Sequence, residues 1–152
     1  MRVWRLVKPR YAPAAFDGEG ARLYGARWTS VGMRAAYASS DAALAVLEVF
    51  VHLKDTAALS SYSLVSASIP DRLIKDLDLS LLPKSWDASP VPPAVQAIGD
   101  DWIRSGSALA VRVPSVLVPS GTNLLINPEH RDFTHLKLES IEPYRFDSRF
   151  IR

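Results

Sequence analysis

Proline and glycine divide this chain of 152 residues into short segments. Its 11 prolines and 7 glycines leave two stretches typical of helices, at residues 42–53 and 94–105, the second followed by Gly106 as its C-cap. Short runs typical of strands lie between the breaks: residues 3–7, 34–39, 62–69, 109–113, 115–119, 123–127 and 136–141. Because these runs do not alternate regularly with helices, the pattern predicts an α+β domain rather than a βαβ repeat.

The composition limits the classes of protein and of site. At 152 residues we expect a single domain that occupies residues 1–152. The chain contains no cysteine, which excludes disulfides, thiolate zinc sites and cysteine nucleophiles and suits a reducing compartment. We find no signal-peptide pattern and no apolar run of about 18 residues. We therefore expect a cytoplasmic protein with no membrane partner.

The charge balance does not indicate a nucleic-acid binder. The 18 basic and 16 acidic residues give a net charge of +2, although the sequence pI is about 9.0. Basic residues gather near the N-terminus, at Arg2, Arg5, Lys8 and Arg10. Nucleic-acid binders usually carry a denser basic stripe. We therefore interpret this segment as solvated or structural, in preference to a contact with a phosphate backbone.

Glu48 is the first candidate site residue. If His52 is neutral, Glu48 is the only charged residue of the predicted helix at 42–53, which is apolar over most of its circumference. An ionised carboxylate in such surroundings is costly unless something pairs with it. No lysine or arginine lies one turn away on the same helix, so its partner must come from elsewhere. An ion pair, a narrow polar gap and an active-site role all remain open.

A second candidate is Arg27, in the sequence GARWTSVG between Gly25 and Gly32. Glycine allows a ligand to approach the backbone, and a guanidinium binds two phosphate oxygens at once. The alternative is a surface arginine stacked on Trp28. The glycine spacing fits neither a Walker loop nor a dinucleotide fingerprint. Tyr37, in the strand that follows, is either a core residue or a platform for a flat ligand ring.

The third region, residues 113–130, is rich in hydroxyl and amide side chains. Ser115 and Ser120 follow prolines, but no Gly-x-Ser-x-Gly pattern is present, so a serine hydrolase is not favoured. Histidines and acids at its end could suggest a metal site: His130, His135, Glu129 and Asp132. The spacing of the two histidines does not place them on one helical face, so we expect no metal.

Taken together, these motifs resemble the RES domain family. They are GARW, Tyr37, Glu48, the VPS that ends at Ser115, Asn123, and INPEH, in that order and at these spacings. The resemblance extends from about residue 4 to residue 133. The family name refers to an arginine, a glutamate and a serine, which match Arg27, Glu48 and Ser115. The family often has GGRWN around the arginine; here Ala26 and Thr29 replace the second glycine and the asparagine.

The resemblance implies a fold and an activity. RES proteins are toxins of RES–Xre toxin–antitoxin modules, with a fold similar to ADP-ribosyltransferases: two small sheets around a cleft that holds NAD, flanked by a few helices. The implied function is that of a type II toxin that cleaves the nicotinamide–ribose bond of NAD, as a glycohydrolase or a phosphorylase. A protein ADP-ribosyltransferase is the alternative, and a non-enzymatic or nucleic-acid-acting module is a second one.

The resemblance also implies partners and residue roles. The expected partner is an Xre-type helix-turn-helix antitoxin that blocks the cleft and supplies the only contact with nucleic acid. The acceptor is water, phosphate or a target protein. Glu48 would stabilise the positive charge of the transition state, Arg27 would bind the pyrophosphate, and Tyr37 would stack on the nicotinamide. The remaining members of the binding set are Trp28, Ser115 and Asn123; whether the last two contact the ligand or hold the charged residues stays open.

Overall fold

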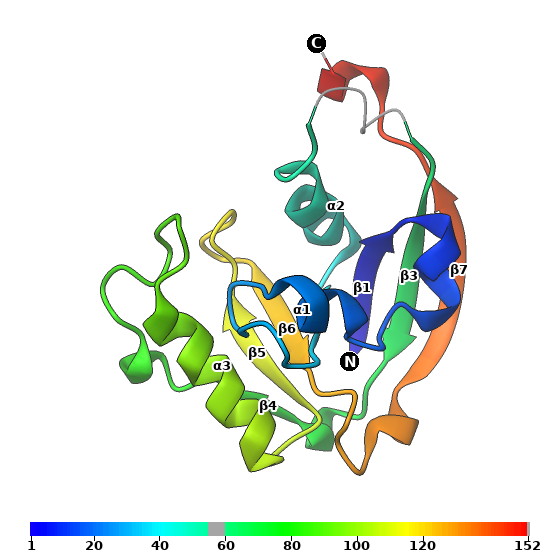
Figure 1. Ribbon diagram of the computed structural model, residues 1–152. Coiled ribbons are helices and arrows are strands. Elements are labelled where there is room, and N and C mark those ends of the chain that lie inside the picture. The colour runs from blue at the N-terminus through cyan, green and yellow to red at the C-terminus, as the bar shows by residue number, and fades with distance from the viewer. Residues whose placement is uncertain (55–59, 152) are drawn as a thin grey trace.

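The computed structural model describes residues 1–54 and 60–151 of the chain (Figure 1). Within that part, seven strands form one hydrogen-bonded sheet in the order β4-β5-β6-β2-β1-β3-β7. Only β4 and β5 run parallel; the other neighbours are antiparallel. The strands are β1 (Arg2–Val7), β2 (Ala36–Ser39), β3 (Tyr62–Ser68), β4 (Ile74–Asp76), β5 (Ala110–Pro114), β6 (Thr122–Ile126) and β7 (Lys137–Tyr144).

In the part of the chain that the structure describes, three α-helices and several 3₁₀ turns accompany the sheet. The helices are α1 (Glu19–Tyr24), α2 (Ala42–Phe50) and α3 (Pro93–Ser105). Helix α3 begins with a proline at its first position and ends at Gly106, which has the left-handed φ of 58° expected of a glycine C-cap. None of the helices in the described residues is long and apolar enough to cross a membrane.

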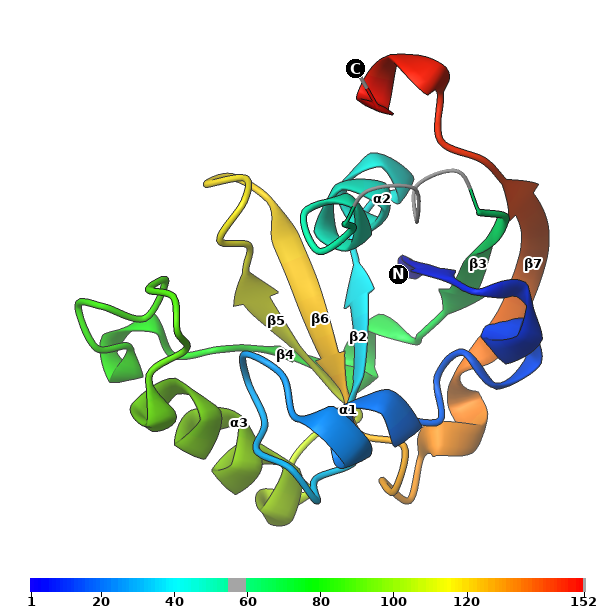
Figure 2. The ribbon, with the colours of Figure 1, turned by 45° about the horizontal axis from the view of Figure 1, so that its top comes forward.

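One residue pair joins the two halves of the sheet. Strands β1 and β2 pair only at Trp4 and Ser39, whereas β1 pairs with β3 along its whole length, from Arg2 to Val7. The sheet therefore has two arms that diverge from this joint, the α3 arm (β4-β5-β6-β2) and the β7 arm (β1-β3-β7) (Figure 2). This is the expected pair of small sheets, linked at one point.

Three apolar clusters hold the arms in place. The largest joins the two arms through Val3 and Val65 on one side and Leu124 and Ile126 on the other. A second lies between α3 and its arm, and a third packs α2 against the β7 arm. Burial of this kind contributes about 25 cal/mol for each Å² removed from water. Helix α2 is thus fixed to one arm and α3 to the other.

The predicted helices and most of the predicted strands are confirmed, with three corrections. The strand predicted at 115–119 is wrong: the segment is a turn, in which the Ser115 hydroxyl accepts hydrogen bonds from the amides of Leu117 and Val118. The helix predicted at 42–53 ends at Phe50, and β4 was not predicted.

The start of α2 offers a test of local stability. The Asp41 carboxylate accepts a hydrogen bond of 2.8 Å from the amide of Leu44, which makes it the N-cap of the helix that carries Glu48. We expect Asp41→Ala to lower the free energy of unfolding by about 1 kcal/mol in urea titrations. Asp41→Asn, which keeps the cap, serves as the control. Equal stability of the alanine variant and wild type would contradict this role.

Candidate active site

Glu48 is held by two neutral donors. Its Oε1 atom accepts a hydrogen bond of 2.8 Å from the Ser115 hydroxyl and one of 2.6 Å from the Asn123 amide. Among residues 1–54 and 60–151, no lysine, arginine or histidine forms an ion pair with Glu48. The apolar helix therefore finds its polar partners on the facing α3 arm. The carboxylate is oriented without being neutralised by a cation.

Each of these donors is itself fixed by further hydrogen bonds. The Ser115 hydroxyl accepts from two backbone amides, of Leu117 and Val118, so its own proton is directed to Glu48. The Asn123 carbonyl accepts from the Ser39 hydroxyl at 2.7 Å, which directs its amide group to the same carboxylate. Ser115 is only 3% exposed. The two residues left open by the sequence thus hold the glutamate.

Arg27 lies across the cleft, attached to a loop between β4 and α3. Its Nη1 atom donates to the carbonyls of Trp86 and Ala88, at 2.9 and 3.2 Å. The side chain of Trp28 is buried in the core, 3% exposed, and stacks on Trp86 with ring centroids 6.0 Å apart. Nη2 and Nε of Arg27 form no hydrogen bond with the described residues. Those two donors are available for an anion.

Tyr37 is fixed by the residues that directly follow Arg27. Its hydroxyl accepts a hydrogen bond of 3.1 Å from the amide of Trp28 and shares one of 2.8 Å with the Thr29 hydroxyl. Burial raises the pKa of Tyr37, and these two hydrogen bonds partly oppose that shift. The hydroxyl thus stays protonated at neutral pH, and the residue lines the cleft from an anchored position.

These residues surround one cleft of about 790 Å³, within the usual range for small-molecule sites. Glu48 lines it from α2, Asn123 and Tyr37 from strands of the α3 arm, and Arg27 and Trp28 from the turn before β2. Ser115 lies behind Glu48 and does not line the cleft. Of the six candidates from the sequence, the structure therefore brings five to the cleft surface and places the sixth directly behind it.

Arg5 is a cleft residue that sequence reasoning did not select. It lies on β1 beside the joint of the two arms and lines the cleft. Its Nε atom is buried with no hydrogen-bond partner in the described chain. Burial lowers the pKa of Arg5 to about 10, opposed by the charge of Asp17. The side chain remains a cation at neutral pH, and only its place in an alternating strand beside Trp4 could have drawn attention to it.

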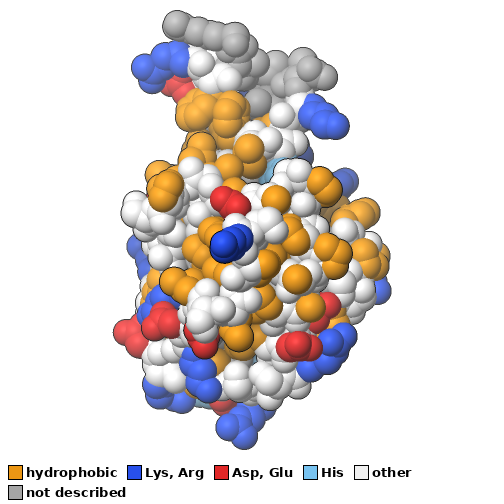
Figure 3. Space-filling model, turned by 90° about the vertical axis from the view of Figure 1, so that its left-hand side faces the viewer, with side chains coloured by type: hydrophobic (Ala, Val, Ile, Leu, Met, Phe, Trp, Pro, Cys, Tyr) orange, Lys and Arg blue, Asp and Glu red, His pale blue; other side chains and the backbone are white. Residues whose placement is uncertain are grey.

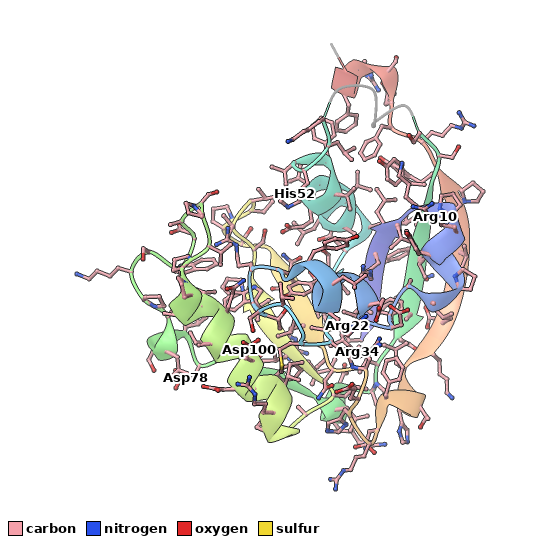
Figure 4. All side chains as sticks on the ribbon, viewed as in Figure 1. Arg10, Arg22, Arg34, His52, Asp78 and Asp100 are labelled. Atoms are coloured by element: carbon pink, nitrogen blue, oxygen red, sulfur yellow. The ribbon has the colours of Figure 1, made fainter. Side chains whose placement is uncertain are left out.

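Helix α3 fixes the turn that carries Arg27. The Gln96 amide donates to the carbonyls of Ala26 and Thr29, at 2.9 and 3.3 Å. The backbone and hydroxyl of Ser30 both donate to Asp100, which is buried on α3 and labelled in Figure 4. A Cβ atom at Gly99 would lie 1.6 Å from the Trp28 carbonyl oxygen. The turn thus rests directly on the helix backbone.

The histidines of the third region take structural positions. Nε2 of His130 donates to the Gly106 carbonyl at 3.0 Å, so its Nδ1 accepts the amide of Asp132 at 3.1 Å. Both ring nitrogens thus bind backbone groups, and the imidazole connects the segment after β6 to the end of α3. Across residues 1–54 and 60–151 there is no group of three or more His, Cys, Asp or Glu that could hold a metal ion.

Comparison with known proteins identifies the family of this cleft. The family model described as RES domain matches residues 2–147. The chain belongs to the RES domain family. A protein named Toxin Res from Yersinia enterocolitica is 39% identical to this RES domain over 146 residues, which cover 96% of this chain and 95% of that protein. The predicted membership is confirmed.

Two further relatives extend the comparison. A protein of Sphingobium named Prs ADP-ribosylating toxin is 36% identical over 98% of this RES domain and 96% of its own length. In three dimensions, a chain from the MbcT–MbcA toxin–antitoxin complex of M. tuberculosis is similar, with a TM-score of 0.79 and 19% identity. The structural match covers 95% of this chain and 84% of the chain from the M. tuberculosis complex. The predicted α+β fold with two small sheets around a cleft is confirmed.

The contact between Gly99 and the Arg27 turn gives a stability prediction. In Gly99→Ala the new methyl group meets backbone, which cannot give way without moving the turn. We expect the free energy of unfolding to fall by about 1–3 kcal/mol. Gly20→Ala on α1 is the matched control, because no atom lies within 4 Å of its Cβ position. Equal effects of the two substitutions would rule out the close approach.

Arg5 gives a prediction of opposite sign. Replacing a partly buried cation whose Nε has no partner by an apolar side chain relieves a desolvation cost, so we expect Arg5→Met to leave the free energy of unfolding unchanged or to raise it by about 1–4 kcal/mol. Arg2→Met, which loses an ion pair with Glu139 at 2.8 Å, should lower it by up to about 1 kcal/mol. A large loss of stability in Arg5→Met would mean that Arg5 is mainly structural.

Proposed function

We propose that this RES protein is an enzyme that cleaves the nicotinamide–ribose bond of NAD, and that it acts as the toxin of a type II toxin–antitoxin system. The observation that carries the proposal is the arrangement of Glu48: a carboxylate in a cleft, oriented by two neutral donors and facing a wall with Arg27. This arrangement suits a ligand that is anionic at one end and develops positive charge at the other.

The carboxylate suits the chemistry of the transition state. As nicotinamide leaves, the ribose becomes oxocarbenium-like, and a fixed negative charge nearby lowers the barrier. Because Ser115 and Asn123 are neutral, Glu48 keeps its full charge for the ligand. Its Oε2 atom has no hydrogen bond with described residues and can contact the ribose. Ser115 and Asn123 are thus positioning residues, which act through Glu48.

The two arginines suit the pyrophosphate. Arg27 has two free donors and Arg5 an unpaired Nε, and both line the cleft. A pyrophosphate carries two negative charges, which would supply each guanidinium with the partner that it lacks. The ring of Tyr37, fixed through its hydroxyl, would stack on the nicotinamide. Trp28 supports this wall from the core through its contact with Trp86.

The names of the relatives support the assignment as a toxin. They do not identify the acceptor of the ADP-ribosyl group. Proteins named Toxin Res match this chain over almost its whole length, and one relative is named an ADP-ribosylating toxin. Water or phosphate as acceptor makes the enzyme a glycohydrolase or phosphorylase; a protein side chain makes it an ADP-ribosyltransferase, the second candidate. The proposed partner is an Xre-type antitoxin that covers the cleft, and the proposed location is the cytoplasm.

The test is NAD consumption by the purified protein, with and without phosphate and with a cell extract as a source of protein acceptors. Glu48→Gln keeps the shape and both hydrogen bonds but removes the charge, so we expect kcat to fall by about 10²–10³ with an unchanged melting temperature. Glu142→Gln, on β7, is the control and should keep wild-type activity.

Mass analysis of the products identifies the acceptor as water, phosphate or protein. Full activity of Glu48→Gln would refute the role of this carboxylate. A wild-type protein that leaves NAD intact under all three conditions would refute the enzymatic function itself.

A further inference from the structure

The cleft contains a second carboxylate, Asp87, that the proposed reaction does not use. It lines the cleft from the loop between β4 and α3, whereas Glu48 lines it from α2. The Asp87 side chain is exposed and forms no hydrogen bond or ion pair with the residues that the structure describes. Figure 3 views the molecule from the side of this loop and α3, where charged side chains stand among hydrophobic ones. Asp87 is thus free to meet a ligand.

Arg27 fixes the position of Asp87 in the cleft. The two carbonyls that Arg27 binds belong to Trp86 and Ala88, the neighbours of Asp87 on either side. Arg27 thus holds the backbone on both sides of Asp87, although the two residues lie 60 positions apart in the sequence, and both line the cleft. Because both residues line the same cleft, a ligand with an anionic group on Arg27 has Asp87 within the same site for another of its groups.

The order of groups in NAD indicates which group this is. The molecule runs from nicotinamide ribose through pyrophosphate to adenosine ribose. With the nicotinamide ribose at Glu48 and the pyrophosphate at Arg27 and Arg5, the adenosine ribose is the next group along the same wall. Its two adjacent hydroxyls are donors, and an ionised carboxylate is an acceptor that binds both at once.

We propose that Asp87 binds the adenosine ribose hydroxyls and makes the cleft selective for NAD against NADP. This inference rests on the proposed function, because it takes the ligand and its direction from it. A 2′-phosphate would replace one of the donors with about two negative charges at the carboxylate. The negative charges of the 2′-phosphate and of the Asp87 carboxylate would repel each other. The hydrogen bond that Asp87 accepts from the 2′-hydroxyl would be lost as well.

The other charges of the cleft agree with this selectivity. Among its described lining residues, Arg5 and Arg27 are the only lysine or arginine side chains, and they match the two charges of the pyrophosphate. No further arginine or lysine of the described lining is left for a third phosphate. Lys84, in the same loop as Asp87, does not line the cleft. His52 lines it from the end of α2, on the Glu48 side (Figure 4).

The test compares kcat/KM for NAD and NADP in wild type, Asp87→Asn and Asp101→Asn. Asp101 lies on α3 with an exposed side chain outside the cleft, so its substitution makes the same change in net charge elsewhere. We expect wild type to prefer NAD, and Asp87→Asn to lower the NAD/NADP ratio about tenfold, chiefly through KM. Asp101→Asn should keep the wild-type ratio.

The outcomes separate this inference from the proposed function. An active enzyme with an unchanged ratio in Asp87→Asn, or with no preference in wild type, overturns the role of Asp87 and leaves NAD cleavage standing. A wild-type protein that cleaves neither nucleotide refutes the proposed function. Calorimetric titration of wild type and Asp87→Asn with NAD and NADP then decides the inference: tighter binding of NAD that the substitution weakens supports it, and equal or absent binding overturns it.

Discussion

The site depends on the single pairing of Trp4 with Ser39 between β1 and β2. Longer pairing would continue the sheet without a break and close the space between the arms; no pairing would let them separate. One pair keeps the arms joined at one end and apart at the other. Residues at this pairing also shape the cleft. The Ser39 hydroxyl orients Asn123, and Arg5, the residue after Trp4, lines the cleft.

Much of the fold follows from local sequence rules. The cap of α3 was visible as Gly106, and β3 and β6 as apolar runs between breaks. The failed strand at 115–119 has the apolar composition of a strand, but the hydroxyl of Ser115 binds two nearby amides and closes a turn. Pairing that depends on distant residues, such as that of the short β4 with β5, leaves no local pattern.

The sequence was enough to predict which residues form the candidate site, but not how they contact one another. The isolated carboxylate in an apolar helix and the family motifs identified Glu48, Arg27 and Tyr37, and the structure brings all three to one cleft. The sequence suggested that Glu48 needs a partner, and a cation was the natural expectation. The partners are instead neutral, and they come from the turn after β5 and from β6, more than 60 residues away. Arg5 and Asp87 are ordinary surface types in the sequence, and only tertiary structure makes them cleft residues.

The hydrogen bonds of Glu48 also determine when the site can exist during synthesis. The helix that carries this residue is complete by Phe50, but its anchors, Ser115 and Asn123, belong to the last third of the chain. The turn of Arg27 likewise waits for Gln96 and Asp100 on α3. A nascent chain on the ribosome therefore carries the Glu48 carboxylate without its orientation. The hydrogen bonds that orient Glu48 can therefore form only after residue 123 has emerged from the ribosome.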